Sequence, residues 1–230
     1  MIVSRRFGYI FLKTARTAGT STEIALSRFA GPDDIISPIM KEDEILRRRE
    51  GGCGPQHHHA RPGQPAWQGR LRTLLRRGHC LFRNHMSAQE LRPLLPEQLW
   101  NDSFRFCVER NPFDRAISLY YWCCRRGEDT SLDEFLESPR LNLLIEHGRR
   151  IYLDDAGELL VHRVLRYEHL ACQLEELRQE LGIPQPIRLP YAKSECRRDR
   201  RHYSEVLSNF ARRRIESLFE PELQRFGYRY

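Results

Sequence analysis

The stretch Phe7-Gly-Tyr-Ile-Phe-Leu-Lys-Thr-Ala-Arg-Thr-Ala-Gly-Thr-Ser21 decides the fold of this chain. Its first six residues are mostly apolar and aromatic, which predicts a β-strand over residues 7–12. Small and hydroxyl residues follow, and residues 24–29 then carry an apolar stripe at helical spacing. Thr20 and Glu23 have the spacing of a capping box, so we expect the helix to begin near Thr20.

Residues 104–118, Phe-Arg-Phe-Cys-Val-Glu-Arg-Asn-Pro-Phe-Asp-Arg-Ala-Ile-Ser, repeat this pattern. A buried strand over residues 103–109 is followed by Asn111 as a helix N-cap and by Pro112 at the first helical position. Arg110 ends the strand, and Ser118 lies two turns into the helix. Ligands of open α/β sheets bind at the carboxyl edge of the strands, so both stretches are expected to contribute to one site.

The rest of the chain adds helices and few strands. We predict helices that begin with capping boxes at Ser87 and Ser131, a β-hairpin around residues 154–157, a helix from Tyr167 to Gly182, and a last amphipathic helix over about residues 203–219. Strands separated by helices imply an α/β fold, with a mainly parallel sheet and helices on both faces. We expect a single domain over residues 1–230, with a flexible insertion at about residues 47–78 that holds a Gly-, Pro- and His-rich loop and a basic amphipathic helix.

Composition limits the partners and the compartment. Lys and Arg number 38 and Asp and Glu 31 in 230 residues, so the net charge of +7 favours an anionic ligand such as a nucleotide, an acidic sugar or nucleic acid. No apolar run is long enough to span a membrane, and the N-terminus lacks a signal-peptide core. The seven cysteines have no regular spacing, which indicates free thiols and a cytoplasmic protein.

The turn before the first helix has the chemistry of a phosphate site. A helix start presents unpaired backbone N–H groups and the positive end of the macrodipole. Gly19 allows an anion to approach closely, and Lys13 and Arg16 add charge. The phosphate-loop pattern of nucleoside triphosphatases is absent. A capped helix with solvated charges explains this segment equally well.

The second stretch also has a structural explanation. Arg110 and Ser118 could reach one phosphate, because the strand end turns back over the helix. Alternatively, Arg110 and Arg115 pair with Glu109 and Asp114 as structural ion pairs, and for this stretch alone that explanation is favoured.

Taken together, the two stretches resemble sulfotransferases that use 3′-phosphoadenosine 5′-phosphosulfate (PAPS). Arg16-Thr-Ala-Gly-Thr-Ser21 resembles the family segment that binds the 5′-phosphosulfate, and residues 110–118 resemble the segment that binds the 3′-phosphate. Asn84-His-Met-Ser87 resembles the segment with the catalytic base in the carbohydrate branch. Residues 166–170, 192–203 and 226–228 resemble later family segments. The closest likeness is to uncharacterised bacterial members of the branch that includes heparan and chondroitin sulfotransferases.

The resemblance implies a P-loop-like nucleotide-binding fold and transfer of a sulfuryl group from PAPS to a hydroxyl of a glycan, a glycolipid or another hydroxylated acceptor. It implies no nucleic-acid partner and no metal. His85 is the implied base, and Arg16 or Lys13 would polarise the bridging oxygen, with Glu109 and Glu168 as reserve candidates for the base. The implied cofactor-binding residues are Arg16, Thr17, Ala18, Gly19, Thr20, Ser21, Arg110, Ser118, Lys193, Ser194 and Arg197.

One position departs from the family pattern. The family has a lysine where this chain has Arg16, and a guanidinium lacks the compact ammonium and cannot serve as a proton source. A second hypothesis is therefore a catalytically weak or inactive protein of the same fold that binds a nucleotide or a polyanion. A kinase-like phosphotransferase is a third, but the phosphate-loop lysine and an evident pair of Mg²⁺-binding carboxylates are missing.

The histidine run at residues 57–59, together with Cys53, raises the question of a zinc site. Three adjacent histidines in a Gly- and Pro-rich loop do not match the spacings that wrap ligands around zinc. The sequence favours a flexible loop on the acceptor side instead.

Overall fold

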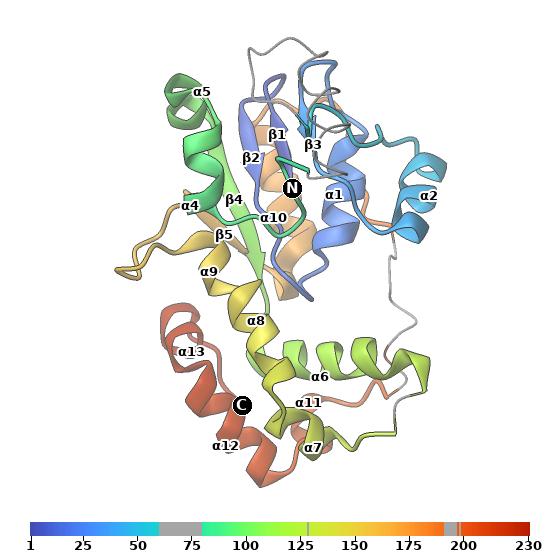
Figure 1. Cartoon of the computed structure of the whole chain (residues 1–230), viewed down its shortest axis with the longest axis vertical. Coiled ribbons are helices and arrows are strands. Elements are labelled where there is room, and N and C mark those ends of the chain that lie inside the picture. The colour runs from blue at the N-terminus through green and yellow to red at the C-terminus, as the bar shows by residue number, and fades with distance from the viewer. Residues whose placement is uncertain (60–79, 128, 191–196, 198) are drawn as a thin grey trace.

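The structure is a computed structural model that describes residues 1–59, 80–127, 129–190, 197 and 199–230 (Figure 1). Its five-stranded sheet has the order β3 (Ile35–Ile36), β1 (Ile2–Ser4), β2 (Tyr9–Phe11), β4 (Phe104–Glu109) and β5 (Arg163–Arg166). β2 pairs with β4 and β4 with β5 in parallel, whereas β1 is antiparallel to both β2 and β3. Every strand except β1 therefore runs in the same direction, and the predicted α/β fold class with a mainly parallel sheet is confirmed.

Helices cover both faces of the sheet, because successive strand side chains point to opposite sides. On one face Val3, Ile10 and Cys107 pack against α4 (Ala88–Leu91), α5 (Glu97–Asp102) and α9 (Arg149–Tyr152). On the other face Ile2, Phe11 and Phe106 pack against α1 (Gly19–Ser27) and α10 (Leu170–Glu180). α2 (Lys41–Arg49) lies beside α1 (Figure 1).

A third core lies beyond the carboxyl ends of the parallel strands (Figure 1). It contains Phe113, Ile117, Phe135, Ile215 and Phe219, all of which are fully or almost fully buried. Its helices are α6 (Pro112–Cys123), α7 (Leu132–Glu137), α8 (Leu143–Glu146), α11 (Tyr203–Val206), α12 (Asn209–Leu218) and α13 (Glu220–Phe226). This helical layer forms the second wall of the space at the sheet edge.

Most predicted helix starts are confirmed. Ser87 and Ser131 each form a complete capping box, and the Asn111 side chain accepts the hydrogen bond of the Phe113 N–H at α6. The capping box predicted at Thr20 is wrong: the N-cap is Ala18, two residues earlier, with a left-handed φ of 61°, and α1 begins at Gly19. The reason is that the carboxylate of the would-be capping residue binds buried cations instead of the helix start.

Two other sequence predictions are corrected. Residues 149–152 form helix α9 rather than one arm of a hairpin, and only an isolated bridge joins Leu153 to Leu159. β5 pairs with β4, which offers a buried parallel neighbour. The predicted last helix is divided, because Leu207 adopts an extended conformation and Ser208 then caps α12.

Part of the predicted insertion belongs to the described chain. Gln56 pairs with Ile36 in a β-bridge, and its Nε2 donates hydrogen bonds of 2.6 and 2.9 Å to the carbonyls of Gly31 and Asp34. The amphipathic helix predicted at residues 66–77 lies outside the described residues. In the part of the chain that the structure describes, no helix is both long and apolar enough to cross a bilayer.

Glu23 of α1 is a fully buried carboxylate among buried cations. Its Oε2 lies 3.1 Å from Lys13 Nζ, and its Oε1 lies 3.0 Å from both Arg47 Nη2 and the Met1 α-ammonium. Burial alone raises the pKa of Glu23, but Lys13, the Met1 ammonium and Arg47 outweigh it and lower the pKa to about 2. Glu23 is therefore ionised and ties α1 to the strand end that carries Lys13.

Replacement of Glu23 by glutamine should be strongly destabilising. Glu23→Gln leaves Lys13 and Arg47 buried without their common carboxylate, and removal of one partner of a buried ion pair costs about 3–5 kcal/mol. Urea unfolding at pH 7 measures this loss. The control is Glu180→Gln, which breaks an exposed pair with Arg163 and should cost less than about 1 kcal/mol. Equal stability of the two variants would show that the Glu23 cluster is not a structural requirement.

Candidate functional site

A cavity of about 990 Å³ lies between the sheet edge and the helical layer. It is bordered by the β2–α1 loop, the residues before α4, the second half of α6 and the start of α10. Most of the predicted site residues line it: Lys13, Arg16, Ala18, Gly19, Thr20, Ser21, His85, Arg110, Ser118 and Arg197. The tertiary structure thus brings both predicted half-sites into one space. Lys193 and Ser194 lie outside the described residues.

The β2–α1 loop is held from two sides. The Leu12 N–H donates to the Phe106 carbonyl at 2.9 Å, and the Thr14 hydroxyl donates to a carbonyl of β4. On the other side, the Ala15 N–H donates to the His147 carbonyl at 2.7 Å. Thr17 is fully buried with its hydroxyl 2.7 Å from that of Thr14, so it fixes the loop and does not line the cavity.

The start of α1 is open toward the cavity. The first N–H groups of a helix have no acceptor within the helix, and no side chain among the described residues caps α1. Gly19 is required here, because a Cβ at this position would lie 2.7 Å from Lys13 Cγ and 2.9 Å from the Thr14 carbonyl oxygen. The backbone amides and the positive end of the macrodipole favour an anion at this point.

Arg16 joins the two half-sites directly. Its Nε and Nη2 donate hydrogen bonds of 3.1 and 2.8 Å to the Ser118 hydroxyl on α6. Its carbonyl accepts a hydrogen bond of 3.2 Å from Arg110 Nη1. Arg16 itself has a left-handed φ of 63°, which turns the chain toward α6. The guanidinium therefore lies beside the residues that were expected to hold a second phosphate.

Arg110 forms an ion pair and also lines the cavity. Its Nε donates to Asp114 at 2.9 Å, Arg197 pairs with the same carboxylate, and its guanidinium lies 4.0 Å from the centre of the Tyr167 ring. Both cations lower the pKa of Asp114 despite its burial. The structural pairing that the sequence offered as an alternative is therefore present, and Arg110 nevertheless lines the cavity.

Arg115 and Glu109 form the second ion pair that the sequence suggested, and this pair has a structural role. They lie 2.5 Å apart and are almost completely buried. Glu109 also accepts a hydrogen bond of 2.9 Å from the Tyr152 hydroxyl, and it does not line the cavity. Glu168 does line it, but both its oxygens accept hydrogen bonds, from the Asn111 N–H at 2.8 Å and from a tyrosine hydroxyl at 3.1 Å.

His85 has the geometry of a neutral base. Its Nδ1 lies 2.9 Å from the Lys13 carbonyl, which can only accept, so Nδ1 carries the proton and Nε2 has a free lone pair. The ring stacks on His147 with a centroid distance of 4.7 Å. Burial, together with Lys13 and His147, lowers the pKa of His85 to about 3. The imidazole is therefore uncharged at neutral pH in the ligand-free cavity.

Sequence reasoning missed some residues of the cavity. His147 follows a short helix of the helical layer, and no local pattern indicates that it stacks on His85. Trp122 of α6 lines the cavity, with its ring centre 6.0 Å from the Arg16 guanidinium. The aromatic run Tyr120-Tyr-Trp122 was the available sequence signal for this residue.

Comparison with known proteins identifies the family. A model described as "Sulfotransferase family" matches residues 2–229. No curated protein matches the chain significantly. Among solved structures, the chain is similar to the crystal structure of a sulfotransferase from Alicyclobacillus acidocaldarius, with 18% identity over 95% of this chain and 93% of that one and a TM-score of 0.47. Because the family model spans nearly the whole chain, this protein belongs to the sulfotransferase family.

Proposed function

We propose that the cavity binds PAPS and that the protein transfers its sulfuryl group to a hydroxyl of a carbohydrate or another hydroxylated acceptor. The observation that carries this proposal is the pair of hydrogen bonds from Arg16 to Ser118, which join the two anion-binding half-sites across one cavity. A co-substrate with anionic groups at both ends fits this arrangement. The cysteine pattern of the sequence favours the cytoplasm as its place of action.

Each end of PAPS would have its own binding groups. The amides at the open start of α1 and the hydroxyls of Thr20 and Ser21 would hold the 5′-phosphosulfate. Arg110 and Ser118 would hold the 3′-phosphate, with Arg197 beside them. The predicted role of Lys193 and Ser194 in closing over the nucleotide is part of this proposal.

The reaction would be an in-line transfer. The acceptor oxygen forms a bond to sulfur while the bond from sulfur to the bridging phosphate oxygen breaks, which leaves 3′-phosphoadenosine 5′-phosphate. His85 Nε2 takes the acceptor proton. Bound anionic phosphates would raise the pKa of His85 from its low ligand-free value and so strengthen it as a base. Amides and cations stabilise the dispersed negative charge of the transferring group, and no metal takes part in this step.

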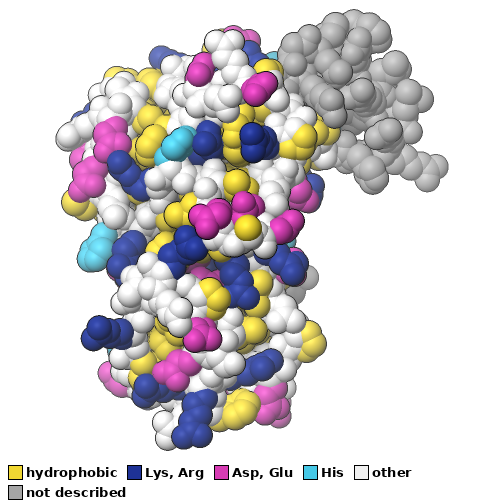
Figure 2. Space-filling view, turned by 90° about the vertical axis from the view of Figure 1, so that its left-hand side faces the viewer, with side chains coloured by type: hydrophobic (Ala, Val, Ile, Leu, Met, Phe, Trp, Pro, Cys, Tyr) yellow, Lys and Arg dark blue, Asp and Glu magenta, His cyan; other side chains and the backbone are white. Residues whose placement is uncertain are grey.

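The second candidate function is nucleotide or polyanion binding with little turnover. Lys13 Nζ is held by buried Glu23, and the Arg16 guanidinium is held by Ser118. Both cations must shift to polarise the bridging oxygen of PAPS. For a polyanion, the surface gives less support: on the face in Figure 2, Lys and Arg side chains lie among Asp and Glu side chains instead of forming one basic patch.

Binding of 3′-phosphoadenosine 5′-phosphate tests the nucleotide site. Calorimetry should show binding to the wild type, and Arg110→Ala should weaken it about 10- to 100-fold, because hydrogen bonds to charged groups contribute about 1.5–3 kcal/mol. Arg150→Ala is the matched control, since Arg150 forms an exposed pair with Glu146 away from the cavity. Absence of binding by the wild type would refute PAPS as the donor.

His85→Ala tests the base. The variant should lose at least about 100-fold in sulfuryl transfer, the usual contribution of a general base, and should still bind 3′-phosphoadenosine 5′-phosphate. His162→Ala, outside the cavity, is the control. Wild-type transfer should also decline as the pH falls, because a protonated imidazole cannot accept the acceptor proton. Full activity of His85→Ala would exclude His85 as the base.

Dependence on Mg²⁺ separates sulfuryl from phosphoryl transfer. Transfer of labelled sulfate from PAPS should proceed at the same rate with Mg²⁺ omitted, because the cavity supplies the positive charge from its own side chains and amides. Phosphoryl transfer from ATP requires Mg²⁺ to neutralise the developing charge. Transfer of the ATP γ-phosphate that depends on Mg²⁺ would instead favour a phosphotransferase. If 3′-phosphoadenosine 5′-phosphate binds but no acceptor is sulfated, the binding function is favoured.

A further inference from the structure

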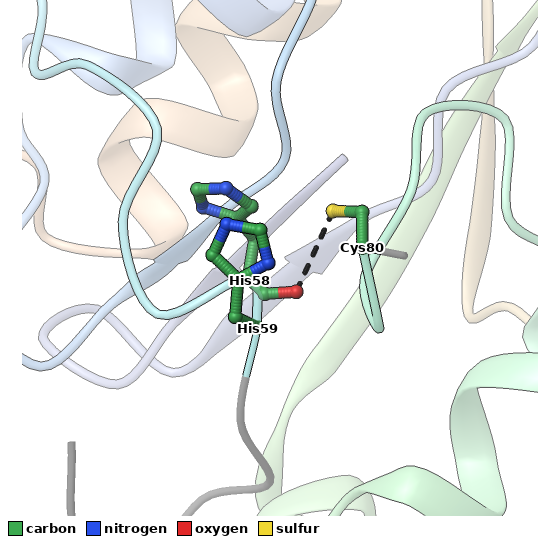
Figure 3. Close-up of side chains that lie close together, drawn as sticks. All are labelled: His58, His59 and Cys80. Atoms are coloured by element: carbon green, nitrogen blue, oxygen red, sulfur yellow. Dashed lines mark hydrogen bonds between the residues drawn. The ribbon is translucent and has the colours of Figure 1, made fainter. Parts of the chain in front are cut away.

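A cluster of soft and borderline ligands lies outside the cavity. One ligand atom each of His58, His59 and Cys80 lies within 4.8 Å of the others (Figure 3). The two imidazole rings are 3.9 Å apart at their centres. The Cys80 thiol lies beside them and donates hydrogen bonds to the backbone carbonyls of Phe82 at 2.8 Å and His58 at 3.5 Å (Figure 3). The sequence argued against a zinc site with Cys53, because three adjacent histidines lack the spacing that wraps ligands around zinc. The fold brings Cys80, from the other side of residues 60–79, to this position instead.

The backbone already holds the two ends of this cluster together. The His58 carbonyl accepts hydrogen bonds from the N–H groups of Leu81 and Phe82 at 2.9 and 3.0 Å. Phe82 is fully buried in the core on one face of the sheet, which anchors the Cys80 side. Gln56, bridged to Ile36, anchors the histidine side. The three side chains are therefore positioned by the fold and not by chance contact of free loops.

The imidazoles lack the hydrogen bonds that buried polar atoms normally have. Nδ1 of His58 and Nδ1 of His59 are both buried and have no hydrogen-bond partner among the described residues. Such an orphaned polar atom costs free energy unless a ligand satisfies the ring.

We propose that His58, His59 and Cys80 bind a zinc ion that joins the two ends of the segment formed by residues 60–79. Two imidazoles and a thiolate are a ligand set that suits zinc, with the fourth position left to water or another ligand. Ligand atoms around tetrahedral zinc lie roughly 3.3–3.8 Å apart for bonds of about 2.0–2.3 Å. Side-chain rotations that move the ligand atoms by about 1 Å therefore complete the site. Binding releases the proton of the Cys80 thiol to the solvent.

The position of the ion gives it a structural role. Cys80 lies five residues before His85, and residues 80–86 connect the cluster to the cavity without regular secondary structure. The ion would fix the start of this connection and hold His59 and Cys80 next to each other. None of its ligands lines the cavity. This role is independent of PAPS binding, so failure of one proposal leaves the other intact.

Neighbouring residues provide matched controls. Cys53 Sγ contacts the Ala30 carbonyl at 3.9 Å, and His57 Nε2 lies 2.7 Å from the Pro32 carbonyl, so both are engaged elsewhere. Cys53→Ser and His57→Asn thus change the same residue types within the same stretch without touching the cluster. Cys80→Ser and His58→Asn remove proposed ligands while keeping side-chain size similar.

The experiment uses the full chain without a histidine tag. After chelation and a circular-dichroism check of folding, one equivalent of Zn²⁺ is added and bound zinc is measured by elemental analysis. We expect one zinc per chain in the wild type and in both controls, and an increase in Tm of at least about 2 °C on zinc binding. Cys80→Ser and His58→Asn should bind zinc at least about 100-fold more weakly, since even second-shell changes cost 10- to 100-fold.

Cobalt distinguishes this site from binding by the histidine run alone. Co²⁺ bound by Cys80 should give a near-ultraviolet thiolate-to-metal absorption band, and Cys80→Ser should abolish that band while Cys53→Ser retains it. The proposal is overturned if the wild type binds no stoichiometric zinc, if Cys80→Ser keeps wild-type zinc affinity, or if bound Co²⁺ shows no thiolate band. If only Cys53→Ser loses the ion, Cys53 and not Cys80 is the cysteine ligand.

Discussion

The parallel pairing of β2 with β4 is the constraint on which the rest of the structure depends. Parallel neighbours end at the same edge of a sheet, so the residues after both strands must meet there. The pairing continues beyond β2, where the Leu12 N–H donates to the Phe106 carbonyl. This register places Arg16 of the first loop within hydrogen-bond distance of Ser118 on the helix after β4. A shift by one residue would turn the side chains of β2 to the opposite face and separate these groups.

Buried charge is arranged around this edge in pairs that serve different purposes. Glu23 and the Arg115–Glu109 pair are almost inaccessible and hold the loop and the strand end in place. Asp114, in contrast, is partly exposed and is shared by Arg110 and Arg197, both of which line the cavity. An arriving phosphate can take hydrogen bonds from these two cations at lower cost than from a fully buried pair, because their charges are already solvated in part.

The helical layer adds groups that the sheet alone could not supply. Its His147 stacks on His85 and its backbone carbonyl fixes the β2–α1 loop, so one residue contacts both sides of the cavity. Sequence patterns predicted the starts of α4, α6 and α7, because a cap is a local interaction between residues two or three apart. The same rule was wrong for α1, because the Glu23 carboxylate binds Lys13 and Arg47 instead of the helix start.

By itself the sequence determined the α/β class, the two strand–turn–helix stretches and most residues of the candidate site, because strand and helix periodicity and the family's motifs are written in contiguous residues. Only the tertiary structure decided which charges pair, that β5 joins β4 instead of forming a hairpin, and that Cys80 rather than Cys53 lies beside the histidine run. These outcomes depend on contacts between residues far apart in the chain, where burial and the choice among several partners set the energy, and no local pattern records that choice.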